Sequence, residues 1–79
     1  MRRLGKVLHI SQQGHIIVQT DKTPPVGAVV VDKDVRNVGR IVDVFGPVKR
    51  PYVAIRPQEI ERTSKLIGQT LYLYMRRPS

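Results

Sequence analysis

Hydrophobic and polar residues alternate along most of this chain, in short runs separated by clusters of Gly, Pro, Asn and Asp. A period of two bounded by turn-forming residues is typical of β-strands that bury one face. The pattern predicts six strands, over residues 4–10, 15–20, 27–32, 38–45, 52–56 and 69–75. We expect the first two to form a hairpin, because a short polar turn that ends in Gly14 joins them.

Residues 57–65 are the one segment with helical character. Pro57 is tolerated at the start of a helix, and Glu59 and Glu61 would lie in the first turn, where the helix dipole favours acids. The segment is long enough for only one or two turns. Short strands without a long helix favour barrel closure, which removes exposed sheet edges. The sequence therefore predicts an all-β, closed six-stranded barrel in a single domain, residues 1–79, with 76–79 as a tail.

The interior of such a barrel takes one side-chain parity from each strand. A one-residue slip of register would invert the assignment within a strand. The residues predicted to fill the interior are Leu8, Ile17, Val29, Val31, Ile41, Val53, Ile55, Leu71 and Leu73.

Segment 38–45 has more apolar residues than one face can hold. Ile41 and Phe45 share one parity, whereas Val42 and Val44 share the other. Val48 in the next loop and Val30 in the third strand add to this surplus. Contiguous exposed apolar surface usually marks a protein contact. The alternative is that bulges and twist bury both faces of the strand.

Composition limits the class of protein. The chain has 79 residues, no Cys, 14 Lys and Arg against 6 Asp and Glu, and a net charge of +8. A domain of this size buries only about 60% of its unfolded surface, so a stabilising partner is expected in the absence of disulfides. The positive charge indicates a polyanion nearby.

The apolar runs are too short for a membrane protein, since a spanning helix needs about 18 apolar residues or more. The first ten residues include Lys6 and His9, which do not fit the apolar core of a signal peptide. We expect a soluble chain that is not secreted and has no membrane partner.

The sequence contains little catalytic or metal-binding chemistry. Asp43 is the one acid in the middle of a predicted strand, and without a nearby base or nucleophile its role is interpreted as structural. His9 and His15 flank the first turn and suit a cross-strand contact better than a metal site that lacks a third ligand. The glycines Gly39, Gly46 and Gly68 form no phosphate-binding motif. We therefore expect no catalytic residues, no cofactor and no metal, and hence no enzyme.

The basic residues leave a second interpretation open. Small clusters occur at residues 2–3, 49–50 and 76–77, and Tyr72 and Tyr74 share one face of the last strand. Exposed aromatic side chains within a basic groove stack the bases of single-stranded RNA. A small basic RNA-binding barrel, such as a ribosomal protein, is therefore the alternative, although strand-face tyrosines more often serve packing.

Two stretches carry a resemblance to a known family. Residues 38–57 read VGRIVDVFGPVKRPYVAIRP, and residues 3–20 read RLGKVLHISQQGHIIVQT. Together they resemble the glycine-arginine-rich-domain subunit of H/ACA ribonucleoproteins, in an archaeal style, and the resemblance extends over residues 3–75. It implies a barrel like those of translation-factor domains. It also implies docking on the catalytic domain of an RNA-guided, dyskerin-like pseudouridine synthase.

The resemblance also implies a role and a location. The synthase would hold the catalytic aspartate, and this subunit would promote substrate loading and product release in rRNA modification. It would meet the guide and substrate RNA mainly indirectly. It would be cytoplasmic in an archaeon, as against nucleolar in eukaryotic relatives. Those relatives carry arginine–glycine repeats that this chain lacks, so RNA binding by such repeats is not transferred.

The surplus apolar residues and the resemblance meet at the same place. We expect Val48 to be the anchor of a synthase-docking face, and Phe45 to bridge the core and the interface. The isolated chain is expected to be able to dimerise through this face. The predicted partner-binding residues are Val42, Val44, Phe45, Gly46, Pro47, Val48, Pro51 and Tyr52. The predicted RNA-proximal basic residues are Lys49, Arg50, Arg76 and Arg77.

Overall fold

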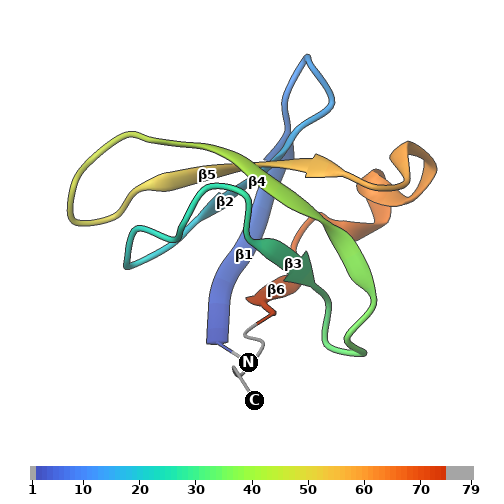
Figure 1. Ribbon diagram of the computed structural model, residues 1–79. Coiled ribbons are helices and arrows are strands. Elements are labelled where there is room, and N and C mark those ends of the chain that lie inside the picture. The colour runs from blue at the N-terminus through green and yellow to red at the C-terminus, as the bar shows by residue number, and fades with distance from the viewer. Residues whose placement is uncertain (1, 75–79) are drawn as a thin grey trace.

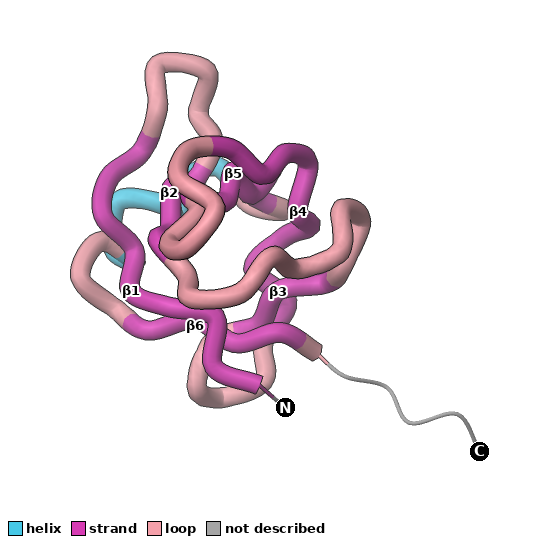
Figure 2. Tube along the Cα trace, turned by 90° about the vertical axis from the view of Figure 1, so that its left-hand side faces the viewer, coloured by secondary structure: helices cyan, strands magenta, loops and turns pink. Residues whose placement is uncertain are grey.

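The computed structural model describes the backbone of residues 2–74 and the side chains of residues 2–59 and 63–74. Its strands are β1 (Arg2–Ile10), β2 (Ile16–Gln19), β3 (Val29–Val31), β4 (Asn37–Phe45), β5 (Tyr52–Pro57) and β6 (Thr70–Leu73). They form a closed barrel in the order β1, β2, β5, β4, β3, β6 (Figure 1). Seen from the side, the strands encircle the core (Figure 2). The predicted all-β, six-stranded closed barrel is confirmed.

A single short helix precedes the last strand, as predicted, but it begins later than expected. It is a 3₁₀ helix, η1 (Ile60–Leu66), and Glu59 is its N-cap residue. Pro57 does not open this helix. It ends β5 instead, where it lies opposite Gly39 of β4. The short helix bridges β5 and β6, and residues 75–79 lie outside the described part of the chain.

The core is one cluster of aliphatic side chains inside the barrel. The last three strands supply the residues that the alternation predicted, because Ile41, Val53, Ile55, Leu71 and Leu73 all belong to it. The other members of the cluster are Leu4, Val7, Ile16, Val18, Val30 and Val38. No helix among residues 2–74 is both long enough and apolar enough to cross a bilayer.

In the first three strands the prediction of which alternate side chains point into the barrel is wrong. Leu8 is 45% exposed and Val29 is partly exposed, whereas Val30, expected among the surplus, lies fully inside the cluster. Ile17 and Val31 are buried but lie outside the core cluster.

Irregular pairing explains part of this difference. The register of β1 shifts between Arg3 and Gly5 against β6, and again between Val7 and His9 against β2. A bulge shifts by one residue the positions along a strand whose side chains point into the barrel. In β1, Leu4 and Val7 therefore point inward, and Leu8 does not. Gly5 also makes a close approach, since a Cβ there would collide with the carbonyl oxygen of Gln19.

The bulge in β4 against β5 determines which side chains of β4 point outward. Ile41 is opposite Ile55 and Asp43 is opposite Ala54, so two residues of β4 advance against one of β5. As a result Val44 follows Ile41 on the inner side and packs against the core, while Phe45 is turned outward and is 44% exposed. Asp43 stabilises this bulge, because its carboxylate accepts a hydrogen bond from the Val44 N–H at 2.9 Å.

Candidate protein-binding face

The outer surface of β2, β5 and β4 is unusually apolar. Ile17, Ala54 and Asp43 lie opposite one another across these strands. Ile17 and Ala54 point outward, because the residues on either side of each belong to the core cluster or flank it. Each is nevertheless only 6% exposed. Outward-facing aliphatic side chains that are this well covered form the floor of a second apolar layer outside the barrel.

Val42 and Phe45 stand at the edge of this layer and are 40% and 44% exposed. Together with Ile17, Ala54 and residues of the β1–β2 turn they line an open hollow of about 420 Å³. We call the outward-facing set Ile17, Val42, Phe45, Tyr52 and Ala54 the apolar face. After the bulge in β4, side chains alternate regularly between the two sides of the sheet. Phe45 therefore lies opposite Tyr52 on the outer side, and Val44 lies opposite Val53 on the inner side.

The β4–β5 loop, residues 46–51, extends from this face. The rings of Phe45 and Tyr52 stack at its base, with centroids 5.7 Å apart and planes inclined by 25°. Gly46 has φ +89°, and a Cβ there would lie 2.7 Å from Cδ2 of Tyr52. Both the backbone angle and the adjacent ring therefore require glycine at this position.

The other end of the loop is attached to β2. The Thr20 N–H donates to the Pro51 carbonyl at 2.9 Å, and the Gln19 Nε2 donates to the Arg50 carbonyl at 3.4 Å. Pro51 is buried, whereas Val48 is 91% exposed. The loop is thus fixed at its base and presents an apolar side chain to solvent.

The predicted partner-binding residues therefore fall into two groups. Val42, Phe45 and Val48 are exposed, as are Gly46 and Pro47. Val44 and Pro51 instead face inward and support the surface, and Tyr52 is half-buried under the Phe45 ring. Val44 packs against the core while Phe45 is 44% exposed, and the expectation that Phe45 bridges core and interface stays a prediction. Of the valines expected as surplus, Val42 and Val48 are exposed, whereas Val30 and Val44 belong to the core or pack against it, so the expected exposed apolar surface is present in part.

The predicted basic and aromatic residues lie at separate places. Lys49 and Arg50 are exposed in the β4–β5 loop, whereas Arg76 and Arg77 lie outside the described residues. Tyr72 lies half-buried on the outside of β6, because Leu71 and Leu73 fill the inside, and Tyr74 just beyond the strand is 47% exposed.

The other candidate chemical groups have structural surroundings. Asp43 is exposed and holds the β4 bulge. His9 and His15 do not face each other, since His9 lies opposite Ile17. The backbone N–H of His15 donates to the Ser11 hydroxyl at 3.1 Å. Among the side chains of residues 2–59 and 63–74, no three His, Cys, Asp or Glu are grouped so that they could hold a metal ion.

Comparison with known proteins decides the family. Residues 1–78 match the family model described as the Gar1/Naf1 RNA binding region. This chain belongs to the Gar1/Naf1 family. The match extends over all the described strands, so the apolar face and the β4–β5 loop are parts of a Gar1/Naf1 barrel.

Named relatives of this Gar1/Naf1 chain include archaeal and eukaryotic proteins. An uncharacterized protein of Methanothermobacter thermautotrophicus is 37% identical over 76 residues, covering 92% of this chain and 83% of that protein. The H/ACA ribonucleoprotein complex non-core subunit NAF1 of Mus musculus is 34% identical over 77 residues, 91% of this chain but 16% of its own length. The H/ACA ribonucleoprotein complex subunit GAR1 of Chaetomium globosum is 31% identical over 72 residues, covering 89% of this chain and 34% of that protein.

Sequence reasoning missed part of the Gar1/Naf1 apolar face. Ile17 was expected inside the barrel, and Ala54 was not assigned to any surface. A signal was present, because Ile16–Gln19 begins with three consecutive apolar residues and segment 52–55 has an apolar residue at every position. Strands that are apolar on both faces are covered on both faces. The direction of each side chain, however, depended on register.

Proposed function

We propose that this Gar1/Naf1 chain is a non-catalytic accessory subunit of an H/ACA ribonucleoprotein and docks on the catalytic domain of its RNA-guided pseudouridine synthase. Two kinds of observation support the proposal. Relatives that align with about nine-tenths of this chain are named H/ACA ribonucleoprotein subunits. The single observation that carries the docking role is the exposure of Phe45 and Val42 on the apolar face, at 44% and 40%, and of Val48 in the adjoining loop, at 91%.

The energetics of this surface favour a protein partner. Burying a valine or phenylalanine side chain fully contributes about 1.5–3 kcal/mol, so covering these three exposed side chains supplies a useful part of an interface energy. Binding also requires ordering the contact residues, which lowers affinity. Here the Phe45–Tyr52 stack and the hydrogen bonds at Arg50 and Pro51 hold the base of the loop before any partner arrives. Lys49 and Arg50 would lie at the polar rim and steer association.

The division of labour follows from the chemistry of the barrel. The mid-strand carboxylate of Asp43 accepts a hydrogen bond from the backbone N–H of Val44, which is a structural role. The synthase would therefore supply the catalytic groups, and the accessory subunit would promote substrate loading and product release by acting on a mobile segment of the synthase. Guide and substrate RNA would be contacted mainly through the synthase.

A stand-alone RNA-binding barrel receives less support. Base stacking needs open aromatic rings, yet of the two tyrosines on which this alternative depends Tyr72 is half-buried and Tyr74 alone is exposed, at 47%. The relatives with informative names are, moreover, subunits of a ribonucleoprotein complex rather than ribosomal proteins.

Substitution Val48→Glu tests the docking role. It would place an unpaired carboxylate in an interface from which water is excluded. We expect the binding free energy to weaken by about 2 kcal/mol or more, roughly a thirtyfold increase in Kd. Calorimetric titration against the purified synthase subunit measures this loss. Folding should be unchanged, because Val48 is 91% exposed.

Val26→Glu is the matched control, since Val26 is also exposed, at 64%, but lies in the β2–β3 loop. It should bind the synthase as the unmodified chain does. A folded Val48→Glu variant with unmodified affinity would contradict the proposed docking face.

A further inference from the structure

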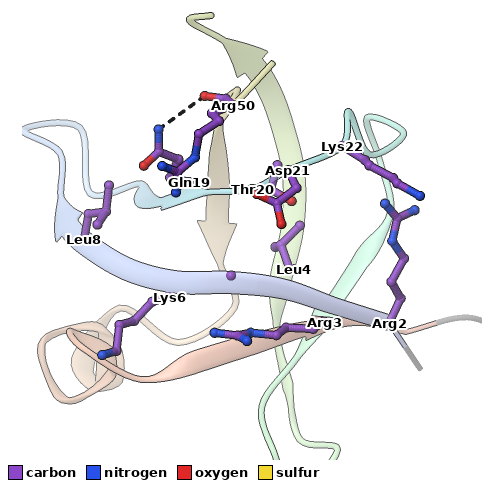
Figure 3. A pocket seen from close by; sticks show the side chains of 11 residues that line it. Arg2, Arg3, Leu4, Lys6, Leu8, Gln19, Thr20, Asp21, Lys22 and Arg50 are labelled. Atoms are coloured by element: carbon purple, nitrogen blue, oxygen red, sulfur yellow. Dashed lines mark hydrogen bonds between the residues drawn. The ribbon is translucent and has the colours of Figure 1, made fainter. Parts of the chain in front are cut away.

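A second surface lies on another side of the barrel, along β1. It is an open groove of about 440 Å³, formed by β1, the end of β2, the beginning of the β2–β3 loop and the β4–β5 loop (Figure 3). Segments far apart in the sequence thus meet at one place. We call this the basic groove, because the side chains of Arg2, Arg3, Lys6, Lys22 and Arg50 line it.

The charge in the basic groove is largely uncompensated. Asp21 is the one acid among the described residues that line it, against five cations. None of these cations is held in an ion pair within the part of the chain that the structure describes. In Figure 3 Arg2 and Lys22 lie at one end of the groove and Arg50 lies further along on the same side of β1, whereas the side chains of Arg3 and Lys6 extend from the other side of β1. Cations gathered in a concavity raise the local potential and attract polyanions.

The frame of the groove is formed by close backbone packing. The absence of a side chain at Gly5 allows β1 to approach the Gln19 carbonyl at the floor. The side-chain amide of Gln19 then donates to the Arg50 carbonyl, a bond drawn in Figure 3. The β4–β5 loop is therefore held against the end of β2, and Arg50 is kept at the groove. A preformed frame lowers the entropy lost on binding.

We infer that the basic groove binds the phosphate backbone of RNA. Spaced lysines and arginines match the repeated charge of a polynucleotide, and such contacts are independent of base sequence. No aromatic side chain lines the groove among the described residues, so base stacking plays no part there. RNA is favoured over an acidic protein because the family model that matches the chain is described as an RNA binding region, without a stated surface.

This inference does not rest on the proposed docking. The basic groove and the apolar face have no residue in common, and the β4–β5 loop, which carries Arg50 and Val48, connects Phe45 of the apolar face with the groove. A partner that covered Val48 would therefore border the groove. RNA lying in the groove would then be held beside that partner.

Neutralising two lysines of the groove tests the inference. The double variant Lys6→Gln and Lys22→Gln is compared with Lys33→Gln and Lys65→Gln, which removes the same charge outside the groove. All four lysines are exposed, so folding should be unaffected. Binding of a fluorescein-labelled single-stranded RNA to the isolated chain is followed by anisotropy over a series of salt concentrations.

We expect the groove variant to bind more weakly and to lower the slope of log K against log salt by about 1.4, at about 0.7 per phosphate contact. The control variant should retain the slope of the unmodified chain. Equal losses in both variants would show diffuse attraction by net charge and would overturn the inference, as would an unmodified chain that does not bind this RNA at low salt.

A competition experiment separates RNA from an acidic protein. Unlabelled RNA of different base composition should displace the probe equally well at the same phosphate concentration. Polyglutamate at a matched charge concentration should displace it poorly. Equal displacement by polyglutamate would assign the groove to an acidic protein surface and overturn the RNA assignment. The synthase is absent from both experiments, so their failure would leave the docking proposal untouched.

Discussion

Gly46 determines the shape of the β4–β5 loop more than any other residue in it. Its φ of +89° belongs to the left-handed region, and the Tyr52 ring occupies the space where a Cβ would project. The adjacent Phe45 ring stacks on Tyr52, so a shift of that ring would disturb two members of the apolar face. The position of Val48 in solvent therefore depends on a residue that has no side chain.

Comparing Gly46→Ala with Gly68→Ala separates the two requirements. Gly68 has φ +85° but open space around it, so alanine there meets only the backbone strain, about 1–2 kcal/mol. Gly46→Ala should lose more stability, because the Tyr52 ring must also move. Urea unfolding measures both free energies. Equal losses would mean that the ring adapts without strain and that the loop does not depend on this contact.

At the scale of elements, bulges decide which side chains enter the barrel. The two register shifts in β1 place Leu4 and Val7 inside and leave Leu8 45% exposed. The shift in β4 places Val44 against the core and turns Phe45 outward. The same irregularity thus closes the barrel and creates the apolar face, since a bulge reverses the orientation of every residue that follows it until the next bulge.

Two leucine-to-alanine substitutions test this assignment. Leu71→Ala removes a fully buried side chain and should lower the free energy of unfolding by about 2–5 kcal/mol. Leu8→Ala removes the same atoms from an exposed position and should lie within about 0.5 kcal/mol of the unmodified chain, as surface substitutions usually do. Circular dichroism during urea titration gives both values. A large loss at Leu8 would place it inside and contradict the β1 register.

The whole molecule combines an apolar face, a basic groove and the β4–β5 loop, which adjoins both. The barrel is small, with a radius of gyration of 11.5 Å, so both surfaces lie within reach of one larger partner. A chain with a net charge of +8 and exposed apolar residues would be covered in a complex that offers both a protein and a polyanion. A ribonucleoprotein offers both, in agreement with the proposed function.

The proposed role in substrate loading and product release predicts a specific kinetic effect. Addition of the subunit to a reconstituted synthase–guide RNA particle should raise the rate of multiple turnover more than the rate of a single turnover, because release often limits repeated cycles. Quantifying pseudouridine formation with excess substrate and with excess enzyme provides the two rates. Equal stimulation of both would remove release from the proposal while leaving docking in place.

Across the apolar face and the adjoining β4–β5 loop, prediction from sequence succeeded where a residue lies in the loop and failed where the direction of its side chain depended on strand pairing. Val48 was assigned to the surface because glycine and proline around it exclude a strand. Ile17 was misassigned to the interior, because both faces of β2 are apolar, and Val44 was counted among the surplus although the β4 bulge turns it toward the core. The basic groove was missed for a different reason, since Lys6, Lys22 and Arg50 belong to segments that have no local relation to one another.

The sequence by itself determined the number of strands, their order along the chain, the short helix before β6 and the presence of more apolar residues than a small barrel can hold. Those properties follow from local preferences: alternation, turn residues and composition. Only the tertiary structure decided which residues point outward and which cations share a groove. Barrel closure sets register through bulges and long-range pairing, and these depend on contacts between strands that no local pattern records.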